Sequence, residues 1–107
     1  MIKAQLADQW DSFFRMRGAD FVKSINGSKA NHWLNAIILD SKEDRDELLT
    51  VTNENGVMTR PVWTLMSKLS MFKNCQTDGL ENSLWLEKRL VNIPSSVPDG
   101  ALKTLDK

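Results

Sequence analysis

At 107 residues, this chain has room for one modest hydrophobic core, so a single domain is expected. Fourteen lysines and arginines balance fourteen aspartates and glutamates. The resulting net charge of zero argues against a nucleic-acid-binding protein and against a polybasic membrane-binding surface. Cys75 is the single cysteine, so no internal disulfide forms. No signal-peptide-like or membrane-spanning apolar run is present, and we expect a cytoplasmic protein.

The first predicted element is a helix that ends at Gly18. Its apolar side chains recur at helical spacing and fall on one face: Ile2, Leu6, Trp10, Phe13 and Phe14. Arg15 and Arg17 suit the negative end of the helix dipole, and Gly18 favours a stop.

Two strands are expected next. Phe21–Ile25 forms a short strand, and Asn26-Gly27 signals a turn. The run from Trp33 to Leu39 is apolar on both faces in its second half, as in a strand covered on both sides. The two strands are predicted to form a hairpin with residues 26–30 as its loop.

A second helix is predicted from Ser41 to Asn55-Gly56. Ser41 is a suitable N-cap, and Asp44 lies three residues later, close to the position of a capping box. Leu48 and Leu49 supply the buried stripe, and glycine accepts the left-handed backbone that ends many helices.

The second half of the chain alternates shorter elements. They are a strand at 57–60, a helix at 63–69, a polar loop at 74–79, a helix at 80–89 and a strand at 91–93. Pro61 lacks an amide hydrogen, so it ends strand pairing or lies on a sheet edge. This order predicts an α+β fold, with a small, mostly antiparallel sheet and helices packed on one face.

The sequence contains no catalytic motif that stands alone. It has no glycine-rich phosphate loop, and His32 has no evident partner. Asp44, Asp46 and Glu47 are most simply a solvated helix face, so no metal site is predicted. The four tryptophans lie one per element, as core residues do.

Arg60 and Trp63 are the candidate binding residues. Arg60 lies at the end of a short strand, and its guanidinium can bind a phosphate or carboxylate through two parallel hydrogen bonds. The alternative for Arg60 is a surface salt bridge. Trp63 follows three residues later and is suited either to cover apolar substrate surface or to pack the short helix on the sheet.

The order and separation of three segments resemble a known family. They are Trp33-Leu34-Asn35-Ala36, Gly56-Val57-Met58-Thr59-Arg60-Pro61-Val62-Trp63 and the run from Leu90 to Ser96. Together they resemble the C-terminal small domain of the DegT/DnrJ/EryC1/StrS family of pyridoxal-phosphate-dependent sugar aminotransferases. The subgroup they resemble most aminates nucleotide-linked 4-keto sugars. The resemblance implies a linking helix at 1–18, a small domain at 19–97, as in fold-type I aminotransferases, and a loose tail at 98–107.

The resemblance also implies a division of labour. Such enzymes hold pyridoxal phosphate on a lysine of the large domain, which is not part of this chain, so the chain alone is expected to bind no cofactor and to be inactive. The segment from Arg60 to Met66 is expected to face the active-site cleft, where Arg60, Trp63 and Met66 would bind the sugar nucleotide. Many members carry a histidine near Met66, and this chain does not, so the sugar is not specified.

The expected partners follow from the same resemblance. They are the missing large domain or full-length enzyme dimer, the sugar nucleotide and the amino-acid donor, with no nucleic acid and no membrane. The alternative function is a stand-alone protein-interaction module without catalysis. In that case Trp10, Phe13 and Phe14 would form the contact surface for a partner protein or for a homodimer.

Overall fold

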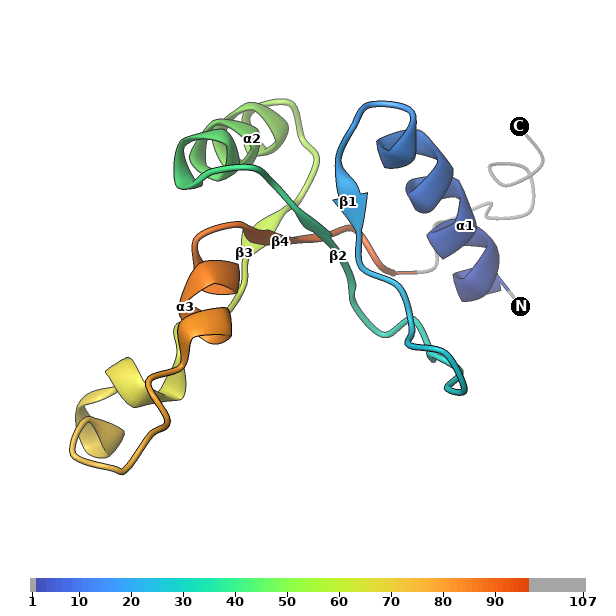
Figure 1. Cartoon of the computed structure of the whole chain (residues 1–107). Helices are drawn as coiled ribbons and strands as arrows, with labels where there is room; N and C mark the ends of the chain where they lie inside the picture. The colour runs from blue at the N-terminus through green and yellow to red at the C-terminus, as the bar shows by residue number, and fades with distance from the viewer. Residues whose placement is uncertain (1, 97–107) are drawn as a thin grey trace.

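The computed structural model describes residues 2–96 and shows an α+β fold, as the sequence predicts (Figure 1). The predicted tail at 98–107 lies outside the described residues, as does Val97. The described elements are α1 (Ile2–Arg15), β1 (Asp20–Phe21), β2 (Asn35–Ile38), α2 (Lys42–Glu54), β3 (Arg60–Pro61), the 3-10 turns η1 (Met66–Lys68) and η2 (Ser70–Phe72), α3 (Glu81–Glu87) and β4 (Leu90–Ile93).

The four described strands form one open sheet in the order β1-β2-β4-β3, and every neighbouring pair is antiparallel. In the central pair, Ile37 lies opposite Val91 and Asn35 opposite Ile93. Cross-strand partners project to the same face of a sheet. This register therefore gathers Ile37, Val91 and Ile93 on one face.

These three residues form the core, and Ile37 and Val91 have no exposed surface. Trp10 and Phe14 of α1, with Leu48 and Leu49 of α2, pack against them. Figure 1 shows α1 and α2 on the same side of the sheet, whereas α3 projects away from it. The prediction of helices packed on one face therefore describes α1 and α2.

Both long helices follow their sequence signals. In α1, the Trp10 and Phe14 rings stack with centroids 5.6 Å apart, and the chain turns at Gly18 with φ of 77°. In α2, Ser41 Oγ accepts a hydrogen bond from the Asp44 amide at 3.1 Å, as an N-cap does. The helix ends before Gly56, whose φ is 80°.

The strands are shorter than predicted. The hairpin is confirmed, but its strands are Asp20–Phe21 and Asn35–Ile38, and the connection spans residues 22–34. Trp33 does not extend the second strand, because its side chain is 65 % exposed and His32 before it has a φ of 57°. The predicted strand at 57–60 is likewise Arg60–Pro61, and Pro61 lies on a sheet edge, where it needs no amide donor.

The predicted helix at 63–69 is wrong. The structure has two 3-10 turns here, because Leu69 between them adopts an extended backbone with ψ of 138°. The last helix also begins later than predicted, at Glu81, since Leu80 has a left-handed backbone. We call residues 63–79 the arm; in Figure 1 it forms the yellow and gold end of the molecule, farthest from α1.

Candidate functional site

Arg60 lies on the edge strand β3, and its side chain is only partly engaged. Its Nη1 donates to Asn53 Oδ1 at 3.3 Å and to the Thr59 carbonyl at 2.9 Å. Within residues 2–96, nothing accepts a hydrogen bond from its Nε or Nη2, and it forms no ion pair with a described acid. Two adjacent guanidinium donors are therefore available, which is the geometry that binds a carboxylate or phosphate through two bonds.

A buried polar network fixes the backbone of Arg60. Thr59 is 2 % exposed, and its hydroxyl lies 2.7 Å from Thr52 Oγ1 of α2. Asn53 Nδ2 donates to Thr59 Oγ1 at 3.1 Å while its Oδ1 accepts from Arg60. Asn53 and Thr59 were not predicted from the sequence. The available signal was a pair of polar residues in the last turn of a helix, just before a short strand.

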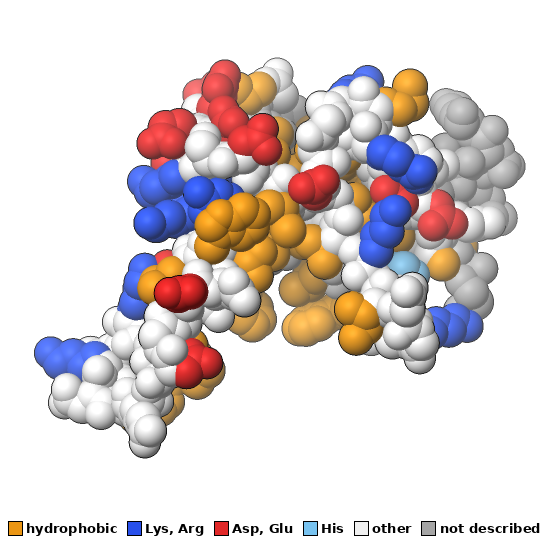
Figure 2. All heavy atoms as spheres, viewed as in Figure 1, with side chains coloured by type: hydrophobic (Ala, Val, Ile, Leu, Met, Phe, Trp, Pro, Cys, Tyr) orange, Lys and Arg blue, Asp and Glu red, His pale blue; other side chains and the backbone are white. Residues whose placement is uncertain are grey.

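Arg60 also lines an apolar groove of about 950 Å³. The groove lies between α1 and the adjoining ends of the sheet, and its apolar wall includes Trp10, Phe13, Trp33, Leu34 and Met58. Lys3 and Arg60 are its charged lining residues, and none of the described residues that line it is acidic. In Figure 2, apolar side chains gather at the centre of the molecule, between the end that carries α1 and the arm. An uncovered apolar surface of this kind is typical of an interaction site.

The structure places Trp63 and Met66 apart from this groove. Trp63 lies in the chain between β3 and η1, and its side chain is 74 % exposed. Met66 begins η1 and lines a smaller groove of about 390 Å³ with Phe72, Cys75 and Leu80. The three predicted binding residues thus lie along one segment, but each has different surroundings.

Glu87 joins this segment to α3. Its Oε2 accepts a hydrogen bond from the Leu65 amide at 2.9 Å, and its Oε1 forms an ion pair with Lys68. These contacts, the Lys68 hydrogen bond first, lower the pKa of Glu87 below its ordinary value. Glu87 was not predicted from the sequence, because its contact with Leu65 joins residues 22 positions apart.

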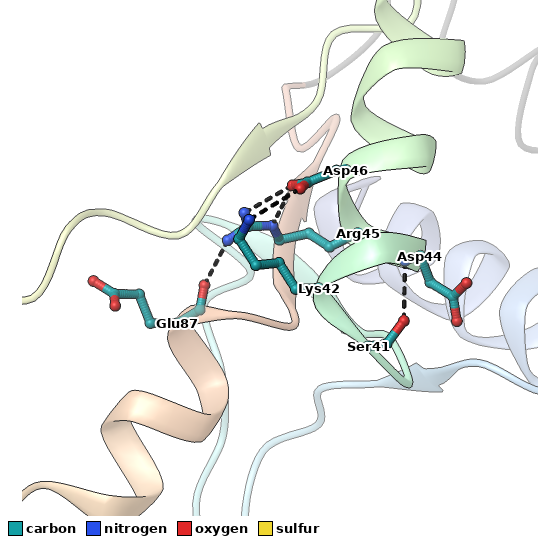
Figure 3. Close-up of polar contacts among 6 residues, drawn as sticks. All are labelled: Ser41, Lys42, Asp44, Arg45, Asp46 and Glu87. Atoms are coloured by element: carbon teal, nitrogen blue, oxygen red, sulfur yellow. Dashed lines mark hydrogen bonds and ion pairs between the residues drawn. The ribbon is translucent and has the colours of Figure 1, made fainter.

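Among the acidic residues of α2, Asp46 is engaged in local ion pairs. Asp46 pairs with Arg45 at 2.7 Å and Lys42 at 3.5 Å, and the Arg45 hydrogen bond is the main cause of its lowered pKa (Figure 3). Among residues 2–96, no three His, Cys, Asp or Glu side chains are arranged to hold a metal ion.

Lys68 does not provide the desolvated amine that a Schiff base with pyridoxal phosphate needs. Its side chain is 48 % exposed and is paired with Glu87.

The described helices include none that is long and apolar enough to cross a membrane.

A scan against models of protein families and a search of curated proteins found no match to the chain.

Proposed function

We propose that this chain is the C-terminal small domain of a pyridoxal-phosphate-dependent aminotransferase. The enzyme would aminate a nucleotide-linked keto sugar in the cytoplasm, for surface polysaccharide biosynthesis. Support comes from the resemblance of the segments around Trp33, Arg60 and Ile93. The α+β fold with its antiparallel sheet agrees with the architecture that this resemblance implies.

The observation that carries the proposal is the open guanidinium of Arg60 beside an uncovered apolar groove. In the proposed enzyme, Nε and Nη2 of Arg60 bind a phosphate or carboxylate oxygen of the substrate. Trp63 and Met66, both more than half exposed, cover apolar parts of the same substrate or of the closing large domain. The apolar groove beside Arg60 packs against a neighbouring domain.

The chemistry then belongs to the large domain, which supplies the cofactor and its lysine. Pyridoxal phosphate provides the electron sink for amino transfer when it is bound there. This domain binds and orients the sugar nucleotide and excludes water from one side of the cleft. The purified chain alone is therefore expected to show no amino transfer.

The test joins this chain to the large domain of a sugar aminotransferase. The fused enzyme should transfer the amino group of glutamate to a keto sugar nucleotide. Arg60→Lys should raise KM for the sugar nucleotide by roughly tenfold, because lysine cannot make the two-pronged contact. Arg15→Lys on α1 is the control, since lysine retains its exposed pairing with Asp11.

Two outcomes contradict the proposal. One is amino transfer by the purified chain without a large domain. The other is a fused enzyme that folds and binds cofactor but does not aminate keto sugar nucleotides. Detection of the native polypeptide in cells with an antibody adds a third check, since the proposal expects a product several times larger than this chain.

The alternative, a stand-alone interaction or dimerisation module, receives mixed support. Trp10 and Phe14 pack against the core, so Phe13, at 42 % exposed, is the accessible member of the aromatic trio. The groove is the surface that would favour such a module. Sedimentation of the purified chain at high concentration separates the cases, because a monomer contradicts dimerisation.

A further inference from the structure

We propose that Glu87 is a positioning residue, which sets the course of the arm and thereby the placement of Trp63 and Met66. The effect of Glu87 on substrate binding rests on the proposed function. The effect of Glu87 on the conformation of the arm is independent of the proposed function.

The carboxylate of Glu87 binds the arm between the two candidate residues, Trp63 and Met66. The amide that it binds belongs to Leu65, which lies between Trp63 and Met66, and its second oxygen binds Lys68 at the end of η1. The Glu87 side chain is 14 % exposed and its bond to the Leu65 amide is partly buried, whereas Lys68 is 48 % exposed. Hydrogen bonds to ionised groups in such surroundings are among the stronger ones in proteins.

Glu87 is itself held by α2. Arg45 Nη1 donates to the Glu87 carbonyl at 2.9 Å, and the Arg45 side chain is 16 % exposed and bound by Asp46. In Figure 3 the Glu87 carboxylate points away from Arg45, while its carbonyl points toward it. A continuous series of polar contacts therefore runs from α2 through Glu87 to the arm.

The arm has little else to fix it. Its other backbone hydrogen bonds, such as Leu69 to Met66 and Phe72 to Leu69, are local. In the described structure, the arm forms three hydrogen bonds with residues outside it. One joins the Asp78 carboxylate to the nearby Leu80 amide, and the other two join Leu65 and Lys68 to Glu87. Local opening of such a segment needs little free energy unless a specific contact opposes it.

The first test is hydrogen–deuterium exchange of the full chain in three variants. Glu87→Ala removes both contacts and should speed exchange of arm amides by roughly tenfold or more, with β2 and β4 unchanged. Glu87→Gln keeps an acceptor for the Leu65 amide but loses the ion pair, so its effect should be smaller. Glu81→Gln, on the same helix, is the matched control and should change nothing, because Glu81 is exposed and forms no described ion pair.

Unchanged exchange in the Glu87→Ala arm would overturn the proposal. Equal loss of protection in β2 and β4 would also overturn it, since Glu87 would then stabilise the whole domain rather than position one segment. The comparison between arm and sheet within one sample makes the result independent of overall stability.

The second test uses the fused enzyme. Glu87→Gln should raise KM for the sugar nucleotide several-fold and leave kcat within about twofold, since the substrate is held less well while the reacting groups are intact. A loss of kcat with unchanged KM contradicts the positioning role. An inactive parent enzyme would instead count against the proposed function, and the exchange experiment would still decide the role of Glu87.

Discussion

The molecule has two regions that differ in how they place apolar side chains. The sheet with α1 and α2 encloses apolar side chains, whereas the arm exposes them. In the first region, Ile37 and Val91 are fully enclosed. In the arm, Trp63, Met66 and Met71 are 74, 65 and 72 % exposed, and no residue from 63 to 79 is buried. The sheet region is therefore stabilised by its own burial, whereas the arm depends on a few polar contacts and leaves Trp63, Met66 and Met71 exposed for another surface.

The largest expected effect comes from the enclosed region. Ile37→Ala should destabilise the domain by about 2–5 kcal/mol, because it removes fully buried methyl groups and leaves a cavity. Ile25→Ala, at a side chain that is 79 % exposed, should change the free energy of unfolding by less than about 0.5 kcal/mol. Urea denaturation measures both. Similar losses for the two variants would show that the enclosed core does not dominate stability.

An intermediate effect is expected where the two regions join. Thr59→Val keeps the shape of a buried side chain but removes the hydroxyl that contacts Thr52 and Asn53. The cost should be about 0.5–1.5 kcal/mol, because half-buried Thr52 and exposed Asn53 each lose one hydrogen-bond partner. Thr64→Val is the matched control, since Thr64 is exposed. Equal denaturation midpoints for wild type and Thr59→Val would contradict an anchoring role for this network.

The same contrast explains which parts of the fold are readable in the sequence. Local signals predicted α1 and α2 well: the apolar stripe, Ser41 as a cap, and glycines 18 and 56 as stops. Within the arm, residues 63–69 were predicted as a helix and residues 74–79 as a polar loop. Its actual course depends on the Glu87 carboxylate, which the chain brings in from 22 positions away, and no local pattern encodes such a contact.

The candidate site divides in the same way. Residue type and the following proline identified Arg60, and the structure leaves two of its donors open. Asn53 and Thr59, which fix it, were not predicted: polar residues at a helix end, such as Asn53, usually serve only as caps and turns, and Thr59 lies in the short segment before β3 with no pattern that marks its contacts. Trp63 and Met66 remain predictions as substrate contacts, since within the described residues both side chains stay more than half exposed.

The smallest expected effect is the change in the conformation of the arm at acidic pH. It probes the contacts of the arm most directly. Because the folded pKa of Glu87 is lowered, its contacts stabilise the arm above the ordinary glutamate pKa, and this stability is lost as pH falls through the lowered value. The amide signal of Leu65 should therefore stay constant at neutral pH and should shift only at pH values below the ordinary glutamate pKa. Asp46 titrates in the same acidic range, since Arg45 and Lys42 lower its pKa too.

Asp46→Asn should leave the Leu65 transition in place, whereas Glu87→Gln should abolish it. A transition that persists in Glu87→Gln would mean that another group holds the arm, and the distinction between a buried sheet region and a carboxylate-held arm would fail.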